Sequence, residues 1–462
     1  MAEPSFTFGA QWRARCFLCG ASYERYHTAT DRLCTQCVER YRHHKFFGDV
    51  PDLASCFATI MPETGAVTER LLYRGFNDLF IGSSDGGEKP QKVLKKVFPS
   101  RLRLPCGQPV LFEMKHLAQF AGFRSAWTLD LSPYIWSGTL KDLRSWAVLS
   151  LAIEHNIKHL ALWTAGNAGY SLAKLVHRWN ATVEDERMRK TVYCLVDALL
   201  APPEMVVTLR SLQCRVAPIS TGRGAILSRE QLYHIVVALS GEHEHYWQVT
   251  DGWDGVGIFM YSLLARQCLH LLSSQLRAQR LASADVYIVL PLGTGNLLLG
   301  FVRGMEQVGE GRAKVVAAVP YGDHMMIPFL PKEPAVNDRP RMRRVEPVAP
   351  KLTGFYSPLS PCLWQLVQDQ DFSHLHAVEF IQVDRAAQIE AAARVFGPTE
   401  KMTVAAEPSA LIAFGALKQL TQRIRDHGLN LERSVVLVVN SGFGLMGTEE
   451  QEFYAKSIFA FR

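Results

Sequence analysis

A lysine stands in a short polar turn directly before an expected helix. The turn is Trp136-Ser137-Gly138-Thr139-Leu140-Lys141-Asp142. A positive charge is unfavourable at the start of a helix, because the helix dipole favours anions there. This position suits a lysine that must react as a neutral amine, as in the formation of a Schiff base. A lysine in an ordinary surface turn has the same local sequence, so the turn by itself leaves both interpretations open.

A second turn, Thr164-Ala165-Gly166-Asn167-Ala168, follows an apolar run and precedes another expected helix. Its small residues allow backbone N–H groups at the helix start to approach a carboxylate. The side chain of Asn167 adds an amide that can bind a phenolic oxygen. A simple Asn/Gly turn at a helix start would use the same residues.

Two more turns have residues suited to binding. The first consists of Gly293, Thr294, Gly295, Asn296 and Leu297. Two glycines and a hydroxyl beside an incipient helix form a nest for an anion such as phosphate. Neither a Walker loop nor GxGxxG is present, since Leu298 occupies the position of the third glycine. In the second turn, Asn440-Ser441-Gly442, Ser441 offers a hydroxyl, although a glycine turn that only reverses the chain remains an alternative.

Four cysteines near the N-terminus have the spacing of a metal site: Cys16, Cys19, Cys34 and Cys37. Two CxxC pairs together supply four thiolates, which complete a tetrahedral shell around zinc. Such a site is structural, because no coordination position remains open for water. The alternative is four free cysteines.

The elements that would position these turns alternate between strand and helix. Apolar, β-rich runs lie at 126–131, 159–163, 191–196, 216–219, 286–290, 315–319, 378–383 and 435–439, and helical periodicity lies between most of them, as at 171–178, 386–395 and 410–426. This alternation predicts an α/β fold with largely parallel sheets and helices on both faces. Residues 328–350 are rich in proline and are expected to form a loop.

Composition narrows the class of protein. Of the 462 residues, 48% are hydrophobic and 20% charged, as in an ordinary globular chain of two or three domains. The net charge of +6 is spread along the chain, apart from a short basic cluster at 339–344, so nucleic-acid binding is not expected, whereas anionic substrates are compatible. No apolar run of membrane-spanning length and no secretion signal are evident, and ten cysteines do not suggest disulfides. We therefore expect a cytoplasmic protein without a membrane partner.

The four turns, in this order, resemble those of fold-type-II pyridoxal-phosphate enzymes, the tryptophan-synthase-β superfamily. Ser137 to Asp142 is similar to that family's T-G-S-F-K-D, Thr164 to Asn167 to its S/T-S/T-G-N, residues 293–297 to its phosphate loop, and Glu407-Pro408-Ser409 to its E-P-x-x-A. With the cysteine pairs in front, the chain looks most like threonine synthases of the archaeal type and cysteate synthase. The resemblance covers roughly residues 105–447.

The resemblance implies a role for each turn. Lys141 would hold pyridoxal phosphate and act as the catalytic base. Thr164, Ala165, Gly166, Asn167 and Ala168 would bind the substrate carboxylate, with Asn167 also beside the cofactor. Residues 293–297 would bind the phosphate, and Ser441 would face the pyridine nitrogen. A serine there, rather than an aspartate, is linked in the family to elimination and replacement instead of transamination.

The resemblance also implies an architecture. It consists of a zinc ribbon at 1–50, a large cofactor domain at 51–142 and 256–462, a small domain at 143–255, and a homodimer. Departures from the family pattern, such as Leu143-Arg144 after Asp142 and the stretch from Asp251 to Gly255, affect the expected substrate more than the expected cofactor.

Three functional hypotheses follow. The first is a threonine-synthase-like carbon–oxygen lyase that acts on an activated, for example O-phosphorylated, amino acid. The second is a β-replacement enzyme or dehydratase, including cysteate-synthase-like chemistry. The third is a zinc-ribbon interaction protein on a degenerate fold without catalysis.

Overall fold

The computed structural model describes Gly107, three short strands before it, and most of residues 109–459. The gaps after residue 109 are 155, 165, 198–200, 202, 221–237, 239–245, 252–255, 309–312, 323, 325, 327–344, 353–358, 360–362, 364–377 and 397–403. The chain divides into two compact units, of which the first comprises residues 1–108, 134–260 and 355–359, and the second residues 109–133, 261–354 and 360–462. The domain bounds expected from the sequence stay a prediction beside this division.

The first unit contains a five-stranded sheet in which every described pairing is parallel. Its strands, in spatial order, are β1 (Phe6–Thr7), β8 (Arg215–Ser220), β7 (Thr191–Asp197), β6 (His159–Trp163) and β9 (Tyr246–Gln248). The helices are α6 (Lys141–Glu154), α7 (Asn167–Thr182) and α8 (Pro203–Ser211), with the short 3-10 helix η2 (Glu186–Met188) before β7. Helix α7 packs against β7 and α6, and α8 against β8. Because the strands are parallel, the loops that follow them meet at one edge of the sheet.

A small hairpin lies near the N-terminus. Strands β2 (Arg13–Arg15) and β3 (Ser22–Glu24) are antiparallel, with Arg15 paired to Ser22. The segment that joins them contains Cys16 and Cys19. These two cysteines, together with Cys34 and Cys37, lie outside the described residues, so the zinc site stays a prediction.

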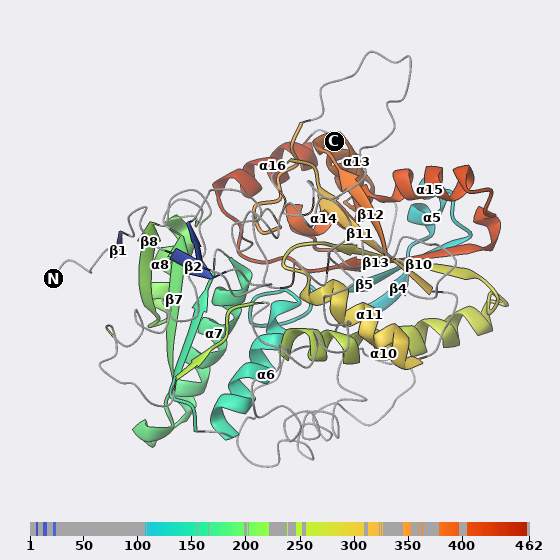
Figure 1. Ribbon diagram of the computed structural model, residues 1–462. Helices are drawn as coiled ribbons and strands as arrows, with labels where there is room; N and C mark the ends of the chain where they lie inside the picture. Colours follow the sequence, from blue (N-terminus) through green and yellow to red (C-terminus); the bar gives the residue numbers. More distant parts are fainter. Residues whose placement is uncertain are drawn as a thin grey trace. The chain divides into compact units, whose positions relative to one another are not determined.

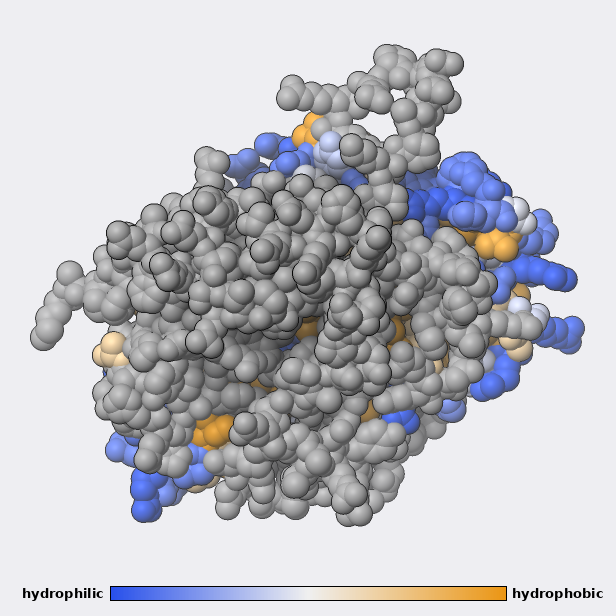
Figure 2. Space-filling view, viewed as in Figure 1, coloured by the Kyte–Doolittle hydropathy of each residue, from blue (hydrophilic) through white to orange (hydrophobic). Residues whose placement is uncertain are grey.

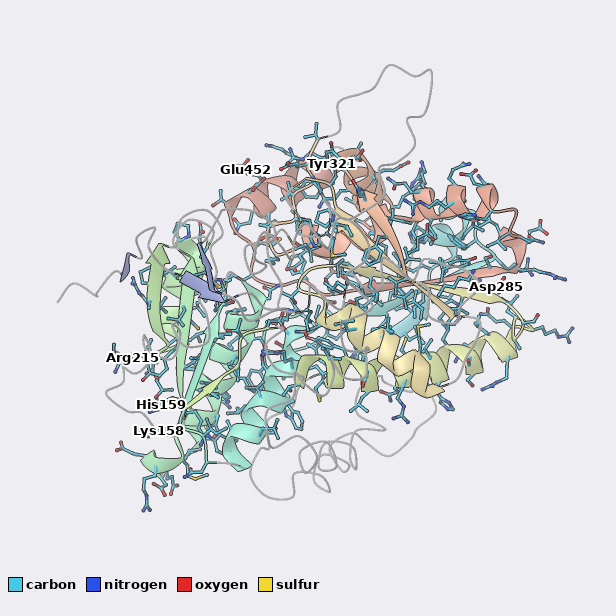
Figure 3. The ribbon with its side chains drawn as sticks, in the orientation of Figure 1. Lys158, His159, Arg215, Asp285, Tyr321 and Glu452 are labelled. Atoms are coloured by element: carbon cyan, nitrogen blue, oxygen red, sulfur yellow. The ribbon has the colours of Figure 1, made fainter. Side chains whose placement is uncertain are left out.

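The second unit contains a six-stranded sheet. Its strands, in spatial order, are β12 (Val378–Val383), β11 (Ala313–Pro320), β10 (Asp285–Pro291), β13 (Ser434–Asn440), β5 (Ser125–Asp130) and β4 (Val110–Glu113). All neighbours are parallel except the edge pair β4 and β5. Figure 3 labels Asp285 at the amino end of β10 and Tyr321 just beyond the carboxyl end of β11, and these two residues mark opposite edges of the sheet.

Helices cover both faces of this sheet (Figure 1). One face carries α5 (Lys115–Ala121), α13 (Arg385–Val395), α14 (Pro408–Gly415), α15 (Leu417–Asp426) and α16 (Thr448–Phe459), and the other α10 (Val256–Ala278) and α11 (Asn296–Val308). In β13, Val436 and Val438 belong to the core beneath α14, and the alternate residue Leu437 is equally buried. Burial on both faces explains why these strands read as continuous apolar runs.

All eight predicted strands are present, with bounds shifted by at most two residues. The single helix expected at 410–426 is wrong, since α14 ends at Gly415 and α15 begins at Leu417. Every residue of α14 is buried, whereas α15 has one buried face and one exposed face. A single straight helix could not be buried on all sides over 408–415 and exposed on one side over 417–426, so the chain turns at Ala416. Sequence periodicity also missed β4, β9 and α16, and the 3-10 helix η4 (Leu431–Arg433).

One described helix has the length and composition of a membrane-spanning helix. Among the described helices, α10 is long and apolar enough to cross a membrane, a property that the sequence was not expected to show, but 71% of that stretch is buried inside the protein. Burial of this kind is typical of a core helix.

In Figure 2, the described surface at the upper right, over α15, is mostly hydrophilic, with isolated hydrophobic residues.

Candidate functional site

Lys141 forms an ion pair with a residue far away in the sequence. Its Nζ donates a hydrogen bond to Asp251, which lies three residues beyond the end of β9 at Gln248. The side chain of Asp251 is 9% exposed, and the Nε of Arg144 lies 3.6 Å from its other oxygen. Arg144 is itself buried and donates to the backbone oxygen of Val249 at 2.6 Å. The carboxylate therefore faces two cations, and the lysine amine is held at the first residue of α6.

The turn before Lys141 is held by the buried carboxylate of Asp142. This group accepts hydrogen bonds from Trp136 N at 2.7 Å, from Ser137 N at 2.8 Å and from Ser137 Oγ at 2.6 Å. Gly138 has a φ of +73°, a left-handed conformation that favours glycine at this point of the turn. Burial raises the pKa of Asp142, and the hydrogen bonds from Ser137 and Ser171 act against that rise.

Asp142 also links the lysine turn to the helix of the predicted substrate loop. Ser171 Oγ donates to Asp142 Oδ1 at 2.6 Å, and Ser171 lies four residues after Asn167, the first residue of α7. Residues four apart lie on the same face of a helix. The starts of α6 and α7 are thus brought together, and with them Lys141 and Asn167.

The substrate loop predicted from the sequence is held by Thr164. Its Oγ1 accepts from Gly166 N at 3.2 Å and from Gly169 N at 3.1 Å. A β-carbon at Gly169 would lie 2.4 Å from Thr164 Cγ2, so this close approach requires glycine. Gly166, Asn167 and Ala168 stand at the start of α7, whereas Ala165 lies outside the described residues.

Strand β9 brings Asp251 to this loop. Thr250 Oγ1 accepts a hydrogen bond from Trp163 N at 2.8 Å, which joins the carboxyl ends of β9 and β6. Sequence analysis noted Asp251 only as a departure from a family pattern, because β9 is too short to give a periodic signal. The only sequence clue was its position before a long apolar helix.

The glycine-rich turn of the second unit lies between β10 and α11. Gly295 has a φ of +101°, a conformation that favours glycine, and Asn296 begins the helix. The first turn of α11 contains no acidic residue, so no carboxylate of its own neutralises the helix start. The first N–H groups of a helix have no partner within it, and they favour an anion.

A buried histidine supports this turn from behind. His324 Nδ1 accepts from Met326 N at 3.2 Å, so Nε2 carries the proton and donates to Leu292 O at 3.0 Å. Burial lowers the pKa of His324 to about 4, and the ring is therefore neutral at physiological pH. The histidine fixes the carbonyl group that immediately precedes Gly293.

Ser441 is buried just beyond the carboxyl end of β13, the strand next to β10. The preceding residue, Asn440, donates from Nδ2 to Asp130 Oδ1 at 2.7 Å and to Ala405 O at 2.8 Å. Asp130 is the last residue of β5, so Asn440 joins two neighbouring strand ends. Ser441 and the turn at 293–297 thus follow adjacent parallel strands at one sheet edge.

The predicted site residues therefore form two groups. Lys141, Thr164, Gly166, Asn167 and Ala168 gather in the first unit, and residues 293–297 with Ser441 gather in the second. Sequence analysis missed Asp251, Arg144 and His324 as members of these groups.

Comparison with solved structures identifies the fold. An L-serine ammonia-lyase from Rhizomucor miehei matches with a TM-score of 0.51 and 16% identity, over 75% of this chain and 97% of that chain. Serine racemase from maize matches with the same TM-score and identity, over 75% and 92%. A pyridoxal 5'-phosphate-dependent aspartate racemase also has a TM-score of 0.51, with 14% identity over 74% and 91%. The chain has the fold of fold-type-II pyridoxal-phosphate enzymes.

Comparisons based on the sequence alone do not detect this likeness. No protein-family model matches the chain, and no curated protein matches it. At identities of 14 to 16%, the shared fold-type-II fold does not carry a reaction with it. The reaction must be argued from the residues of the two groups.

Proposed function

We propose that this protein is a pyridoxal-phosphate-dependent enzyme that eliminates or replaces a group on the β or γ carbon of an amino acid, with Lys141 as the lysine that carries the cofactor. The observation that carries the proposal is the pairing of Lys141 with Asp251 beside the start of α7, within a fold-type-II fold. A partly buried lysine that is ion-paired beside an Asn/Gly helix start is unusual for an ordinary surface turn.

The residues of the second unit fit the cofactor. The start of α11 offers N–H groups without a nearby acidic residue in its first turn, which suits a phosphate. We assign phosphate binding to Gly293, Thr294, Gly295, Asn296 and Leu297. The Ser441 hydroxyl, at the neighbouring strand end, would donate to the pyridine nitrogen.

Pyridoxal phosphate, when bound, withdraws electrons from the α-carbon of the attached amino acid. The chain supplies the remaining functions. Lys141 Nζ would take the α-proton and return it, and Asp251 would hold that nitrogen in position. The N–H group of Ala168 and the amide of Asn167 would bind the substrate carboxylate, which fixes the direction of the α-carbon bonds.

For the substrate we retain two candidates. Threonine-synthase-like chemistry on an O-phosphorylated amino acid is supported by the order of the motifs and by the N-terminal cysteine pairs. Dehydratase chemistry on serine or threonine is supported by Asp251, because a carboxylate near the substrate loop suits a hydroxyl more than a phosphate.

One experiment tests the enzyme class and the substrate together. Protein incubated with pyridoxal phosphate should turn yellow, and borohydride should fix a pyridoxyl group on Lys141 in the peptide map. Serine, threonine, O-phosphoserine and O-phosphohomoserine are then screened for keto acid and phosphate release. A colourless protein would contradict the proposal and favour a non-catalytic interaction protein, whereas a label on another lysine would overturn the assignment of Lys141.

A further inference from the structure

A buried ion cluster lies in the second unit, outside the predicted site residues. Lys351 Nζ is 2.6 Å from Glu407 Oε2 and 3.0 Å from Glu450 Oε1. The three side chains are 11%, 4% and 2% exposed. Two carboxylates and one ammonium are costly to bury unless their atoms are well paired, so a specific arrangement must repay the desolvation.

Both carboxylates hold the loop that follows Ser441. Glu407 Oε2 accepts from Gly444 N at 3.0 Å, and Glu450 Oε2 accepts from Gly447 N at 3.1 Å. The backbone N of Glu407 donates in turn to Gly442 O at 3.0 Å. Lys351 is therefore ion-paired with both acidic groups that fix loop 442–447.

The backbone at Lys351 also lies beside the glycine-rich turn. A β-carbon at Gly293 would lie 3.7 Å from Lys351 O and 3.3 Å from Leu352 Cδ2. Residues 351–352 thus pack directly against the first glycine of the proposed phosphate loop. Lys351 therefore lies beside this loop through its backbone, and its side chain is linked to the Ser441 loop through Glu407 and Glu450.

We propose that Lys351 is a positioning residue that fixes the phosphate loop and the Ser441 loop relative to each other, so that phosphate and pyridine nitrogen are bound at the correct separation. This inference rests on the proposed function, because that function assigns the two loops to the cofactor. Burial by itself lowers the pKa of Lys351, but the Glu407 and Glu450 carboxylates raise it overall, so the ammonium form is kept.

The test compares Lys351→Met and Glu450→Gln with the control Lys456→Met. Lys456 lies on α16 with Glu450, but its ion pair with Glu452 is exposed, with side chains 80% and 61% accessible. We measure the dissociation constants for pyridoxal phosphate and inorganic phosphate, and the amide exchange of loops 293–297 and 442–447 without cofactor. Lys351→Met should weaken cofactor binding by about ten- to hundredfold, as expected for losing hydrogen bonds to charged groups.

We expect faster amide exchange in both loops at once, while the amides of β10 and β13 stay protected. A general loss of stability would instead speed exchange in these strands as well. Glu450→Gln keeps an acceptor for Gly447 N, so it should shift the same quantities in the same direction but less. If Lys351→Met does not fold, the Glu450→Gln variant tests the positioning role instead. Lys456→Met should behave as wild type.

Two failures are distinguishable. If wild-type protein does not bind pyridoxal phosphate, the proposed function is lost, while amide exchange still tests the coupling of the loops. If wild type binds the cofactor and both cluster variants bind it equally well with unchanged loop exchange, Lys351 has no positioning role.

Discussion

Lys141 and Asp251 are 110 positions apart in the sequence and share a hydrogen bond in the fold. Arg144, one turn further along α6, faces the same carboxylate. Asp251 therefore keeps a cationic neighbour whatever the charge on Lys141. A carboxylate in this setting can hold the lysine nitrogen throughout a reaction in which that nitrogen gains and loses protons.

Replacing Asp251 by Asn should slow the reaction of Lys141 with the cofactor. Asn keeps the shape but loses the carboxylate that holds Lys141 Nζ in position, and we expect about a tenfold or larger loss in kcat, with a smaller effect on KM. The measurement is the rate of borohydride-fixed pyridoxyl on Lys141, together with steady-state kinetics. Asp185→Asn is the matched control, because the ion pair of Asp185 with Arg187 is exposed. Equal labelling rates in both variants would contradict the role.

Lys141→Ala should abolish turnover while leaving the fold. Loss of a general base costs about 10²- to 10⁴-fold, and loss of the covalent link adds to this. Cofactor binding through residues 293–297 should persist at reduced affinity, measurable by equilibrium dialysis. Retained turnover in Lys141→Ala would show that another residue carries the chemistry.

His324 should make the protein less stable in mild acid. Its pKa of about 4 in the fold lies below the unfolded value of 6.5, so the unfolded chain binds the proton first. The stability that His324 contributes is fully present above pH 6.5 and is lost as the pH falls toward 4, with a magnitude on the order of 3 kcal/mol. Denaturant unfolding between pH 7.5 and about 4 measures this.

His324→Gln should remove that part of the pH dependence, whereas His116→Gln should retain it, since His116 lies on α5 with its Nε2 at 2.7 Å from Arg394 O and not beside Leu292 O. Identical pH profiles for wild type and His324→Gln would mean that the ring is not held neutral.

Ser441→Asp tests the expected reaction class. A carboxylate beside the pyridine nitrogen favours its protonated form, so the absorption of the bound cofactor should change and elimination should slow. Ser441→Ala removes one hydrogen bond, worth about 0.5–1.5 kcal/mol, and should have the milder effect. If neither spectrum changes in folded, cofactor-binding protein, Ser441 only turns the chain after β13.

The cysteine pairs should bind one zinc ion. Metal analysis of protein purified without chelator should give one equivalent, and replacing Cys16 and Cys19 by Ser should release it. Two CxxC pairs supply the four thiolates that a structural zinc site needs. Stability should fall on zinc removal, with cofactor binding unchanged. Zinc-free protein of wild-type stability would indicate free thiols.

The sequence by itself determined the secondary structure around the site. Continuous apolar runs predicted the buried parallel strands, because strands covered on both faces need no polar residues. Glycine, asparagine and small residues after these runs predicted the turns at 164–168 and 293–297, because backbone conformation and close approach are local properties. The local sequence around Lys141 predicted a helix start, and the structure places this residue at the first position of α6, but its role was implied only by the resemblance of the four turns together.

Only the tertiary structure decided which distant residues meet. Asp251 reaches Lys141 because β9 pairs beside β6, and Asn440 reaches Asp130 because β13 pairs beside β5, 310 positions away. Lys351 meets Glu407 and Glu450 through the packing of three separate segments. The break between α14 and α15 likewise follows from burial. None of these contacts has a local signal, because strand order and helix packing are set by the free energy of the whole core.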